Sequence, residues 1–196
     1  MKLELARSAG FCYGVRRAVE MAEQAARSGC RCVMLGPVIH NGSVIERLKA
    51  QGVALAETPE QVPEGAAVII RSHGEGRPVH QALAARGCRV IDATCPNVAR
   101  IHHLVARAEA EGRQVLIIGM RAHPEVQAIA GWCGHPVVLE GAQELEQWLQ
   151  EGPERKSLPL TMVSQTTSTQ MIWDLSVEKA KKQCTNLKIF DTICNA

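Results

Sequence analysis

The sequence has few aromatic residues, little net charge and no long hydrophobic run. Aromatic side chains make up 3% of the 196 residues, which argues against a binding site built on aromatic stacking. The 22 basic and 20 acidic side chains give a formal charge of +2, with no basic block to attract nucleic acid or a membrane surface. Apolar runs such as "VLIIGM" fall far short of the roughly 18 to 20 residues that cross a bilayer, and the opening "MKLELARSAG" contains no apolar signal-peptide core. We therefore predict a cytoplasmic protein that binds neither nucleic acid nor membranes.

Cysteine, by contrast, is abundant, with eight residues. In a cytoplasmic chain these are better interpreted as thiols or metal ligands than as a disulfide framework, because the cytosol keeps thiols reduced. Five of them are expected to be small core residues, and the "CRC" pair among these is predicted to lie in a strand with its side chains on opposite faces: Cys30, Cys32, Cys88, Cys133 and Cys184.

One stretch of the sequence occurs twice. The segments that begin at Cys12 and Cys95 align without a gap at an offset of 83 residues, and seven of their 29 positions are identical. Each segment reads as a cysteine, an amphipathic helix ending near a glycine (Gly29 or Gly112), a buried strand, a glycine turn and a histidine. Both cysteines are expected at helix N-termini, where the helix dipole favours the thiolate.

The remaining elements follow the same order. Short apolar strands alternate with helices, which predicts an α/β fold with parallel sheets covered on both faces and with ligands at the carboxyl ends of the strands. We predict a first α/β lobe over residues 1–94, a second over 95–190, and the start of a third at 191–196. That last assignment rests on "DTIC", which ends at Cys194 and resembles the "DATC" that ends at Cys95.

Three cysteines stand at equivalent points of these units: Cys12, Cys95 and Cys194. Their wide separation differs from the local Cys-x-x-Cys spacing of zinc ribbons and ferredoxins, yet it favours a metal site at which the lobes meet. Zinc would accept three cysteines and one histidine. An iron–sulfur cluster on three thiolates would instead keep one iron open for a substrate.

Polar residues follow the predicted strands. His40, His73 and His123 are expected at one sheet edge, where imidazoles and backbone N–H groups suit an anion. Glu125, in "HPE", is either a proton donor beside that site or an acidic residue that stabilises a helix N-terminus after Pro124. The run that ends at Thr166 and Thr167 reaches the same edge.

Seven motifs together resemble the 4-hydroxy-3-methylbut-2-enyl diphosphate reductase (LytB) family, over residues 3–196: "GFCYGVRRAV", "GPVIHN", "IIRSHGE", "DATCPNV", "GMRAHPEV", "SQTT" and "DTICNA". The resemblance implies three α/β lobes around a pseudo-threefold axis. It also implies a two-electron reductive dehydroxylation of 4-hydroxy-3-methylbut-2-enyl diphosphate to isopentenyl and dimethylallyl diphosphates, in the methylerythritol phosphate pathway of isoprenoid biosynthesis.

The resemblance also implies roles for individual residues. A [4Fe–4S] cluster would be held by Cys12, Cys95 and Cys194, and would receive electrons from a ferredoxin or flavodoxin. The substrate diphosphate would be bound by the three histidines named above, while Glu125 would deliver protons with Thr166 in its hydrogen-bond network.

One part of the family pattern has no counterpart in the sequence. Members of the family continue beyond the third cysteine into a lobe that supplies a Ser-x-Asn type loop to the diphosphate. We expect a longer protein or a separate chain to provide it. An alternative hypothesis is a non-catalytic iron–sulfur or redox-sensing module, and a cluster-free phosphate binder is disfavoured because the sequence has no glycine-rich phosphate loop.

Overall fold

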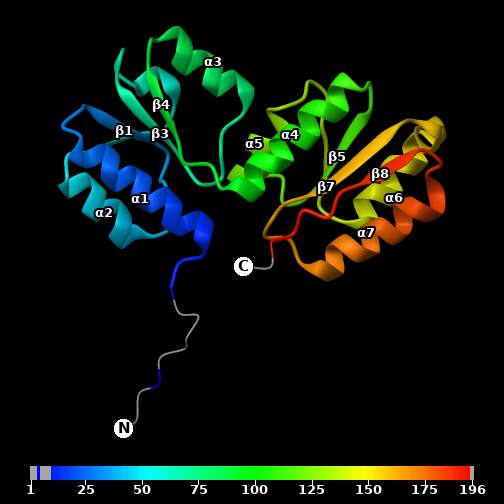
Figure 1. Cartoon of the computed structure of the whole chain (residues 1–196). Helices are drawn as coiled ribbons and strands as arrows, with labels where there is room; N and C mark the ends of the chain where they lie inside the picture. The colour runs from blue at the N-terminus through cyan, green and yellow to red at the C-terminus, as the bar shows by residue number, and fades with distance from the viewer. Residues whose placement is uncertain (1–3, 5–9, 195–196) are drawn as a thin grey trace.

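The computed structural model describes residue 4 and residues 10–194 of the chain. Their strands form two separate four-stranded sheets, and every pair of neighbouring strands is parallel (Figure 1). The first sheet has the order β2 (Ala54–Ala56), β1 (Cys32–Leu35), β3 (Ala67–Ile70), β4 (Arg89–Asp92). The second repeats that order with β6 (Val137–Leu139), β5 (Gln114–Ile118), β7 (Leu160–Ser164), β8 (Leu187–Ile189). The predicted α/β class with parallel sheets is confirmed.

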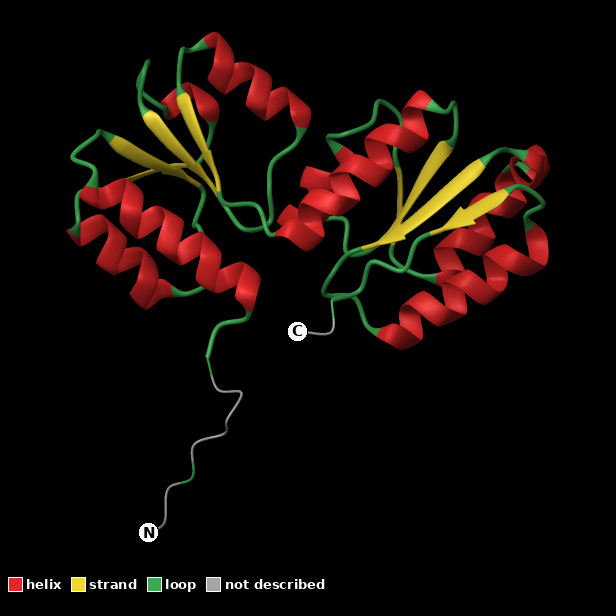
Figure 2. Cartoon of the chain, viewed as in Figure 1, coloured by secondary structure: helices red, strands yellow, loops and turns green. Residues whose placement is uncertain are grey.

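Helices flank both sheets (Figure 2). We call the elements from α1 to β4 the first lobe and those from α4 to β8 the second lobe. The helices of the first lobe are α1 (Tyr13–Arg27), α2 (Gly42–Ala50), the short η1 (Pro59–Gln61) and α3 (Arg77–Ala85). Those of the second are α4 (Pro96–Ala110), α5 (Pro124–Ala130), α6 (Ala142–Glu151), η2 (Pro153–Ser157) and α7 (Gln170–Gln183). Among the described residues, no helix combines the length and apolar character needed to cross a membrane.

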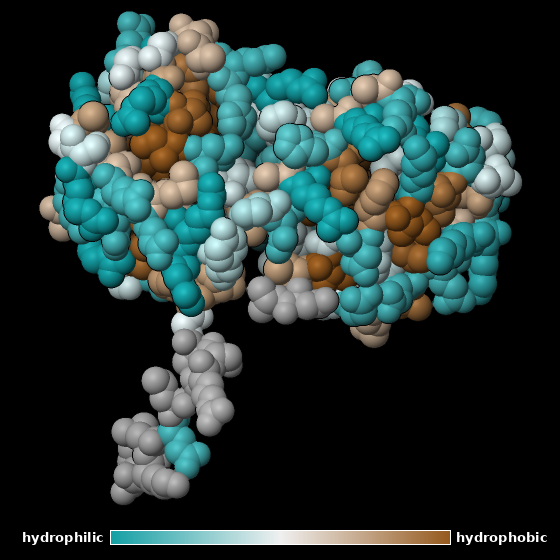
Figure 3. Space-filling model, viewed as in Figure 1, coloured by the Kyte–Doolittle hydropathy of each residue, from teal (hydrophilic) through white to brown (hydrophobic). Residues whose placement is uncertain are grey.

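The strands read as continuous apolar runs because both of their faces are buried. In β1, Met34 packs with α1 and α2, whereas Val33 on the other face packs with Leu83 of α3. In β5, Leu116 packs with α6 and α7, and Ile117 packs with Ile101 of α4. Burying such a side chain contributes about 1.5 to 3 kcal/mol. Hydrophilic residues cover much of the outer surface, with hydrophobic ones visible between them in both lobes (Figure 3).

The predicted repeat is present in three dimensions. Cys12 and Cys95 are the N-cap residues of α1 and α4, two helices of 15 residues each. Gly29 and Gly112 follow these helices with φ values of +69° and +66°, the left-handed conformation that glycine adopts most readily. The expected positions of both cysteines at helix N-termini are therefore confirmed.

The prediction for the "CRC" pair was wrong on both counts, since side chains two residues apart in a strand point to the same face and only one of the two cysteines lies in the strand. Only Cys32 lies in β1, whereas Cys30 is exposed in the turn that precedes it. The strand pairing starts at Arg31, whose carbonyl accepts from the N–H of Ala67, so the chain is still completing its turn at Cys30. Cys32 is buried as expected, and burial raises the pKa of its thiol.

The strand order places a ligand crevice at the carboxyl edge of each sheet. β1 and β3 are neighbours, as are β5 and β7. After the first strand of each pair the chain continues to the outer strand on one side of the sheet, and after the second strand it continues to the outer strand on the other side. Loops that diverge in this way open a crevice at the strand ends. The lobe division at residue 94 falls between β4 and α4 and stays a prediction, and residues 195–196 of the expected third unit lie outside the described residues.

Candidate functional site

A cavity of about 200 Å³ lies where the carboxyl edges of the two sheets meet. Its walls include six of the eight residues predicted for the site: Cys12, His73, Cys95, Glu125, Thr166 and Cys194. They come from both lobes and are spread over 183 positions of the sequence. The other two, His40 and His123, join the site through their contacts with His73.

Two of the cysteines begin helices at this cavity. Cys12 is exposed and Cys95 is half-buried, and each caps its helix without using its side chain, so the sulfur is free to bind elsewhere. The backbone N–H of Cys95 donates to the carbonyl of Ser72 at 2.9 Å, which ties α4 to the loop after β3. Both cysteines thus lie at the N-terminal end of a helix and at the same cavity.

Cys194 is held in the same way in the second lobe. Its backbone N–H donates to the carbonyl of Thr166 at 2.8 Å, in the loop after β7. The Asp-x-x-Cys motif forms a matching turn in both lobes, because the Asp191 carboxylate accepts from the N–H of Ile193 at 3.1 Å, and Asp92 accepts from Thr94 at 2.9 Å. Cys194 therefore occupies in the second lobe the place that Cys95 occupies in the first.

The three cysteines suit an iron–sulfur cluster better than a single metal ion. Among the described residues, the histidines form a set of ligand atoms close enough to share one ion, whereas the cysteine sulfurs do not. In a cluster each thiolate binds a different iron, so the sulfurs stand apart around the group. Three cysteines that line one cavity, two of them at helix N-termini, match that donor set.

The three histidines form a compact group beside the cavity. The ring centres of His40 and His73 are 4.7 Å apart, those of His73 and His123 are 5.4 Å apart, and those of His40 and His123 are 6.4 Å apart. His40 and His73 follow β1 and β3, the two strands that flank the crevice of the first lobe, and His123 follows β5 of the second. The prediction that they share one sheet edge was wrong, because the edges of two separate sheets bring these imidazoles together.

Hydrogen bonding at His123 distinguishes an anion site from a metal site. Its Nδ1 accepts from the backbone N–H of Glu125 at 3.1 Å, so the proton of the neutral ring is on Nε2. A metal ligand has the opposite arrangement, because its second ring nitrogen normally donates a hydrogen bond. His123 therefore presents an N–H donor, which suits a phosphate oxygen.

His73 lies in a more buried position. Burial, assisted by His40, His123 and Arg71, lowers the pKa of His73 to about 4, so the ring is neutral near pH 7. Its Nδ1 is buried and has no hydrogen-bond partner in the structure. Arg71, two residues earlier in the chain, forms an ion pair of 2.7 Å with the buried Glu75. An incoming anion would supply both an acceptor and the charge that favours protonation of this ring.

Glu125 is almost fully buried, at 2% exposure, and both of its carboxylate oxygens are bound. Oε1 accepts from the backbone N–H of Thr166 and Oε2 accepts from the Thr166 hydroxyl, each at 2.6 Å. Glu125 also occupies the first turn of α5, so both interpretations of this residue have structural support. Because Thr166 also accepts from Cys194, a continuous chain of bonds links the carboxylate to the third cysteine.

Of the other residues that line the cavity, two contact the candidate cysteines and were not identified from the sequence. Gly14 packs against Cys95, and the amide of Asn97 donates to the sulfur of Cys194 at 3.2 Å. Each lies two residues after a cysteine of the repeat, Cys12 or Cys95. This shared position is the feature of the sequence that could have identified them.

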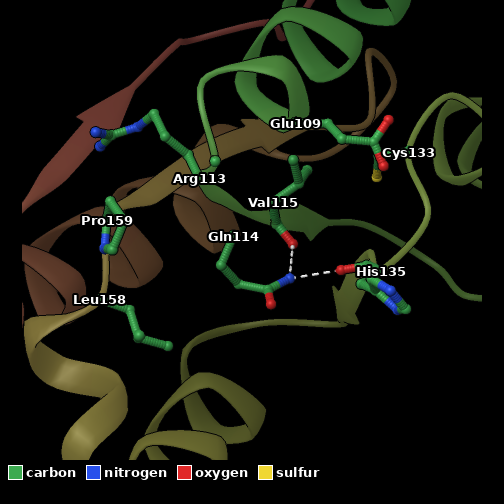
Figure 4. A pocket seen from close by; sticks show the side chains of 9 residues that line it. Glu109, Arg113, Gln114, Val115, Cys133, His135, Leu158 and Pro159 are labelled. Atoms are coloured by element: carbon green, nitrogen blue, oxygen red, sulfur yellow. Dashed lines mark hydrogen bonds between the residues drawn. The ribbon is translucent and has the colours of Figure 1, made fainter.

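A second cavity, of about 320 Å³, lies at the opposite, amino-terminal edge of the second sheet (Figure 4). Gln114 projects into it, and its amide donates to the carbonyls of Val115 and His135 at 3.2 and 2.6 Å. Burial raises the pKa of the Cys133 thiol there to about 11, which keeps it protonated. No residue of the predicted site lines this cavity, so the chemistry is concentrated at the carboxyl edge.

The LytB protein family model matches residues 3–196. The chain belongs to this family. A curated 4-hydroxy-3-methylbut-2-enyl diphosphate reductase from Caldanaerobacter subterraneus is 34% identical over 204 residues, which cover all of this chain and 68% of that protein. The reductase of Aquifex aeolicus is 37% identical, over 98% of this chain and 66% of its own length.

Solved structures agree with this assignment. One is (E)-4-hydroxy-3-methyl-but-2-enyl diphosphate reductase, described as the terminal enzyme of the non-mevalonate pathway, with a TM-score of 0.83 and 36% identity over 97% of this chain and 67% of that one. The reductase of Plasmodium falciparum gives a TM-score of 0.86 at 26% identity and covers 97% of this chain and 60% of its own. The chain thus spans 60 to 68% of the length of these four relatives.

Proposed function

We propose that this chain holds a [4Fe–4S] cluster on Cys12, Cys95 and Cys194 and uses it in the reductive dehydroxylation of 4-hydroxy-3-methylbut-2-enyl diphosphate. Two electrons and two protons would remove the hydroxyl as water and leave isopentenyl or dimethylallyl diphosphate. The observation that carries the proposal is the convergence of three cysteines and the buried Glu125–Thr166 pair on one cavity. The names of the family's members supply the substrate and the reaction.

When bound, the cluster would supply the electrons and a Lewis-acidic iron for the substrate hydroxyl. The protein's own part begins with the diphosphate, which His40, His73 and His123 would bind. His123 donates from Nε2, and His73 would gain a proton as the anion arrives. Because the diphosphate is remote from the reacting carbon, its binding energy serves to orient that carbon toward the cysteines.

Glu125 and Thr166 would transfer protons to the substrate. A hydroxyl is a poor leaving group, and protonation allows it to depart as water. Thr166 donates to the carboxylate in the present structure, and its hydroxyl can rotate to pass a proton between Glu125 and a group in the cavity. Burial of both residues excludes bulk water from this path.

The proposal extends to partners. A ferredoxin or flavodoxin is proposed as electron donor, and the third of the relatives' length that this chain does not span is proposed to complete the substrate site, either as part of a longer protein or as a separate chain. Cys12 is exposed at the cavity, so an electron donor could approach on that side.

Glu125→Gln tests the assigned chemistry. The chain is completed with the part of its relatives' length that it does not span and is reconstituted anaerobically with iron and sulfide. Turnover is then measured with a chemical reductant, alongside iron content and the visible spectrum. Glu125→Gln is expected to keep the cluster and lose turnover by roughly 10²-fold or more. Glu20→Gln, on the exposed side of α1, is the matched control and should behave as the wild type.

Full turnover in Glu125→Gln would contradict the proton-donor role. A stable cluster with no affinity for the diphosphate would instead favour the alternative of a non-catalytic iron–sulfur module.

A further inference from the structure

The second helical residue after each repeat cysteine contacts the next of the three candidate ligand cysteines, Cys12, Cys95 and Cys194. Gly14 in α1 and Asn97 in α4 are equivalent positions of the repeat. Gly14 lies against Cys95, and Asn97 lies against Cys194. Equivalent positions of the repeat therefore each contact a cysteine sulfur, one with a glycine and the other with an asparagine.

The two residues make different contacts with their sulfurs. A Cβ atom at position 14 would lie 2.5 Å from Sγ of Cys95, so glycine leaves room for that sulfur and offers it no side-chain donor. At position 97 the amide Nδ2 donates to Sγ of Cys194 at 3.2 Å. This distance is ordinary for a hydrogen bond to sulfur, whose larger radius lengthens the contact.

The bond is not a by-product of helix capping. Asparagine near a helix start is most often a cap, yet the N-cap of α4 is Cys95 and Pro96 fills the first helical position. The Asn97 side chain points away from its own helix to a residue 97 positions later in the chain. It therefore connects α4 to the segment after β8.

We propose that Asn97 is a positioning residue for the metal centre, which holds the sulfur of Cys194 and raises the reduction potential of the cluster. This inference rests on the proposed function, because it requires Cys194 to be a cluster ligand. Reduction adds negative charge to the cluster and its sulfurs, and an N–H donor stabilises the more negative state. The repeat then makes the ligands unequal, since Cys194 receives this donor and Cys95 receives none from Gly14.

The proposal that Asn97 holds the sulfur follows from the two attachments of Cys194. Its backbone is fixed to the loop after β7 through Thr166, while its sulfur is fixed to α4 through Asn97. Because a cluster ligand must keep its sulfur oriented, loss of the second attachment leaves only the backbone to hold it.

The test uses two substitutions of similar size to asparagine. Asn97→Leu removes the donor, and Asn97→Asp replaces it with a carboxylate that repels a thiolate. Asn186→Leu is the matched control, since its amide oxygen accepts from Arg113 at the opposite edge of the second sheet. Each protein is reconstituted anaerobically, its iron is counted, its fold is checked by circular dichroism, and its midpoint potential is measured by redox titration.

We expect Asn97→Leu to lower the ratio of reduced to oxidised cluster at a fixed potential by roughly tenfold, which is about 59 mV for one electron. Asn97→Asp should shift the potential further in the same direction or lose iron with its fold intact, and Asn186→Leu should match the wild type. Equal iron content and equal midpoint potential in the wild type and Asn97→Leu would overturn the inference. A wild-type protein that takes up no cluster would be a different result, because it would remove the proposed function itself.

Discussion

Thr166 donates two hydrogen bonds to Glu125, one from its backbone to Oε1 and one from its hydroxyl to Oε2, each 2.6 Å long. The carboxylate thus has a partner for both oxygens although it is 2% exposed. Thr166 also accepts from the backbone of Cys194, so one threonine joins the proposed proton donor to a proposed cluster ligand. A buried carboxylate needs such hydrogen-bond partners. The pair therefore stabilises the fold and also supplies the proposed proton donor.

Thr166→Val should affect both stability and turnover. Valine keeps the backbone bond and the shape but removes the hydroxyl, so Oε2 of Glu125 loses a charge-assisted hydrogen bond. We expect the free energy of unfolding to fall by about 1 to 3 kcal/mol, measured by urea denaturation of the metal-free protein. Turnover should fall by roughly tenfold or more, while Thr166→Ser retains most of both. A Thr166→Val protein with wild-type stability would contradict the hydrogen-bond geometry.

Gly14→Ala should affect the metal-bound protein far more than the metal-free one. Without a cluster, the sulfur of Cys95 can rotate away from the new methyl group, and alanine favours the helix by up to about 1 kcal/mol. With a cluster the sulfur is fixed, so the 2.5 Å contact cannot be relieved. We expect a wild-type melting temperature before reconstitution and loss of iron uptake after it.

Gly42→Ala provides the comparison for that experiment. Gly42 begins α2, and no atom lies within 4 Å of a Cβ added there, so this variant should reconstitute normally. Normal iron uptake by Gly14→Ala would show that Cys95 is free to move in the loaded protein, and hence that it is not a ligand.

The contact between the lobes should be sensitive to a single methyl group. A Cβ at Gly131 would lie 2.6 Å from the backbone of Gly76, in a junction where Arg77 N–H donates to the Gly131 carbonyl at 3.1 Å and Trp132 Nε1 donates to the Glu75 carbonyl at 3.0 Å. Gly131→Ala is therefore expected to cost about 1 to 3 kcal/mol in urea denaturation.

The same substitution should weaken binding of the diphosphate. His73 and His123 lie on opposite sides of this junction, so separating the lobes separates two proposed ligands of one anion. Isothermal titration calorimetry would measure the change. Unaltered affinity alongside lower stability would mean that the histidines keep their geometry independently of the junction.

Acid should destabilise the fold through buried histidines. His102 is 5% exposed, and burial lowers its pKa to about 4; His80 and His103 act in the same direction, while Asp92 opposes them. An unfolded histidine has a pKa of about 6.5, so between pH 6.5 and 4 the unfolded chain binds a proton that the folded chain does not. Stability is therefore complete above pH 6.5 and falls toward pH 4.

His102→Phe checks the origin of that slope. Phenylalanine keeps a ring against Trp132, which stacks on His102 at 5.2 Å, and it removes the titrating group along with its unpartnered Nε2. Urea denaturation across the range should show a shallower loss of stability, by at most about 1.4 kcal/mol per pH unit. His103→Gln, at an exposed position of the same helix, should leave the slope close to that of the wild type.

Much of the fold was predictable from the sequence because its signals are local. The cysteine before each helix, the glycine after it and the apolar run that follows all lie within 25 residues. Parallel strands then place His40 and His73 at the carboxyl edge of the first sheet, and His123 at the carboxyl edge of the second. The closeness of His40 and His73 follows from the pairing of β1 with β3 rather than from side-chain detail.

Other features depend on how two lobes pack, which no local pattern encodes. The bond from Asn97 to Cys194 joins residues 97 positions apart, and Trp132 contacts Glu75 across the junction. The misplacement of Cys30 has a local cause, since a single residue decides whether a turn has ended and strand pairing has begun.

Anaerobic reconstitution of this chain with iron and sulfide tests the central claim most directly. Iron is counted and the visible spectrum is recorded before and after addition of 4-hydroxy-3-methylbut-2-enyl diphosphate, with Cys194→Ser in parallel. The account predicts a cluster in the wild type that changes its spectrum with the diphosphate, and little or no stable cluster in Cys194→Ser. A wild-type chain that binds no cluster, or a cluster unaffected by both the substitution and the diphosphate, would contradict it.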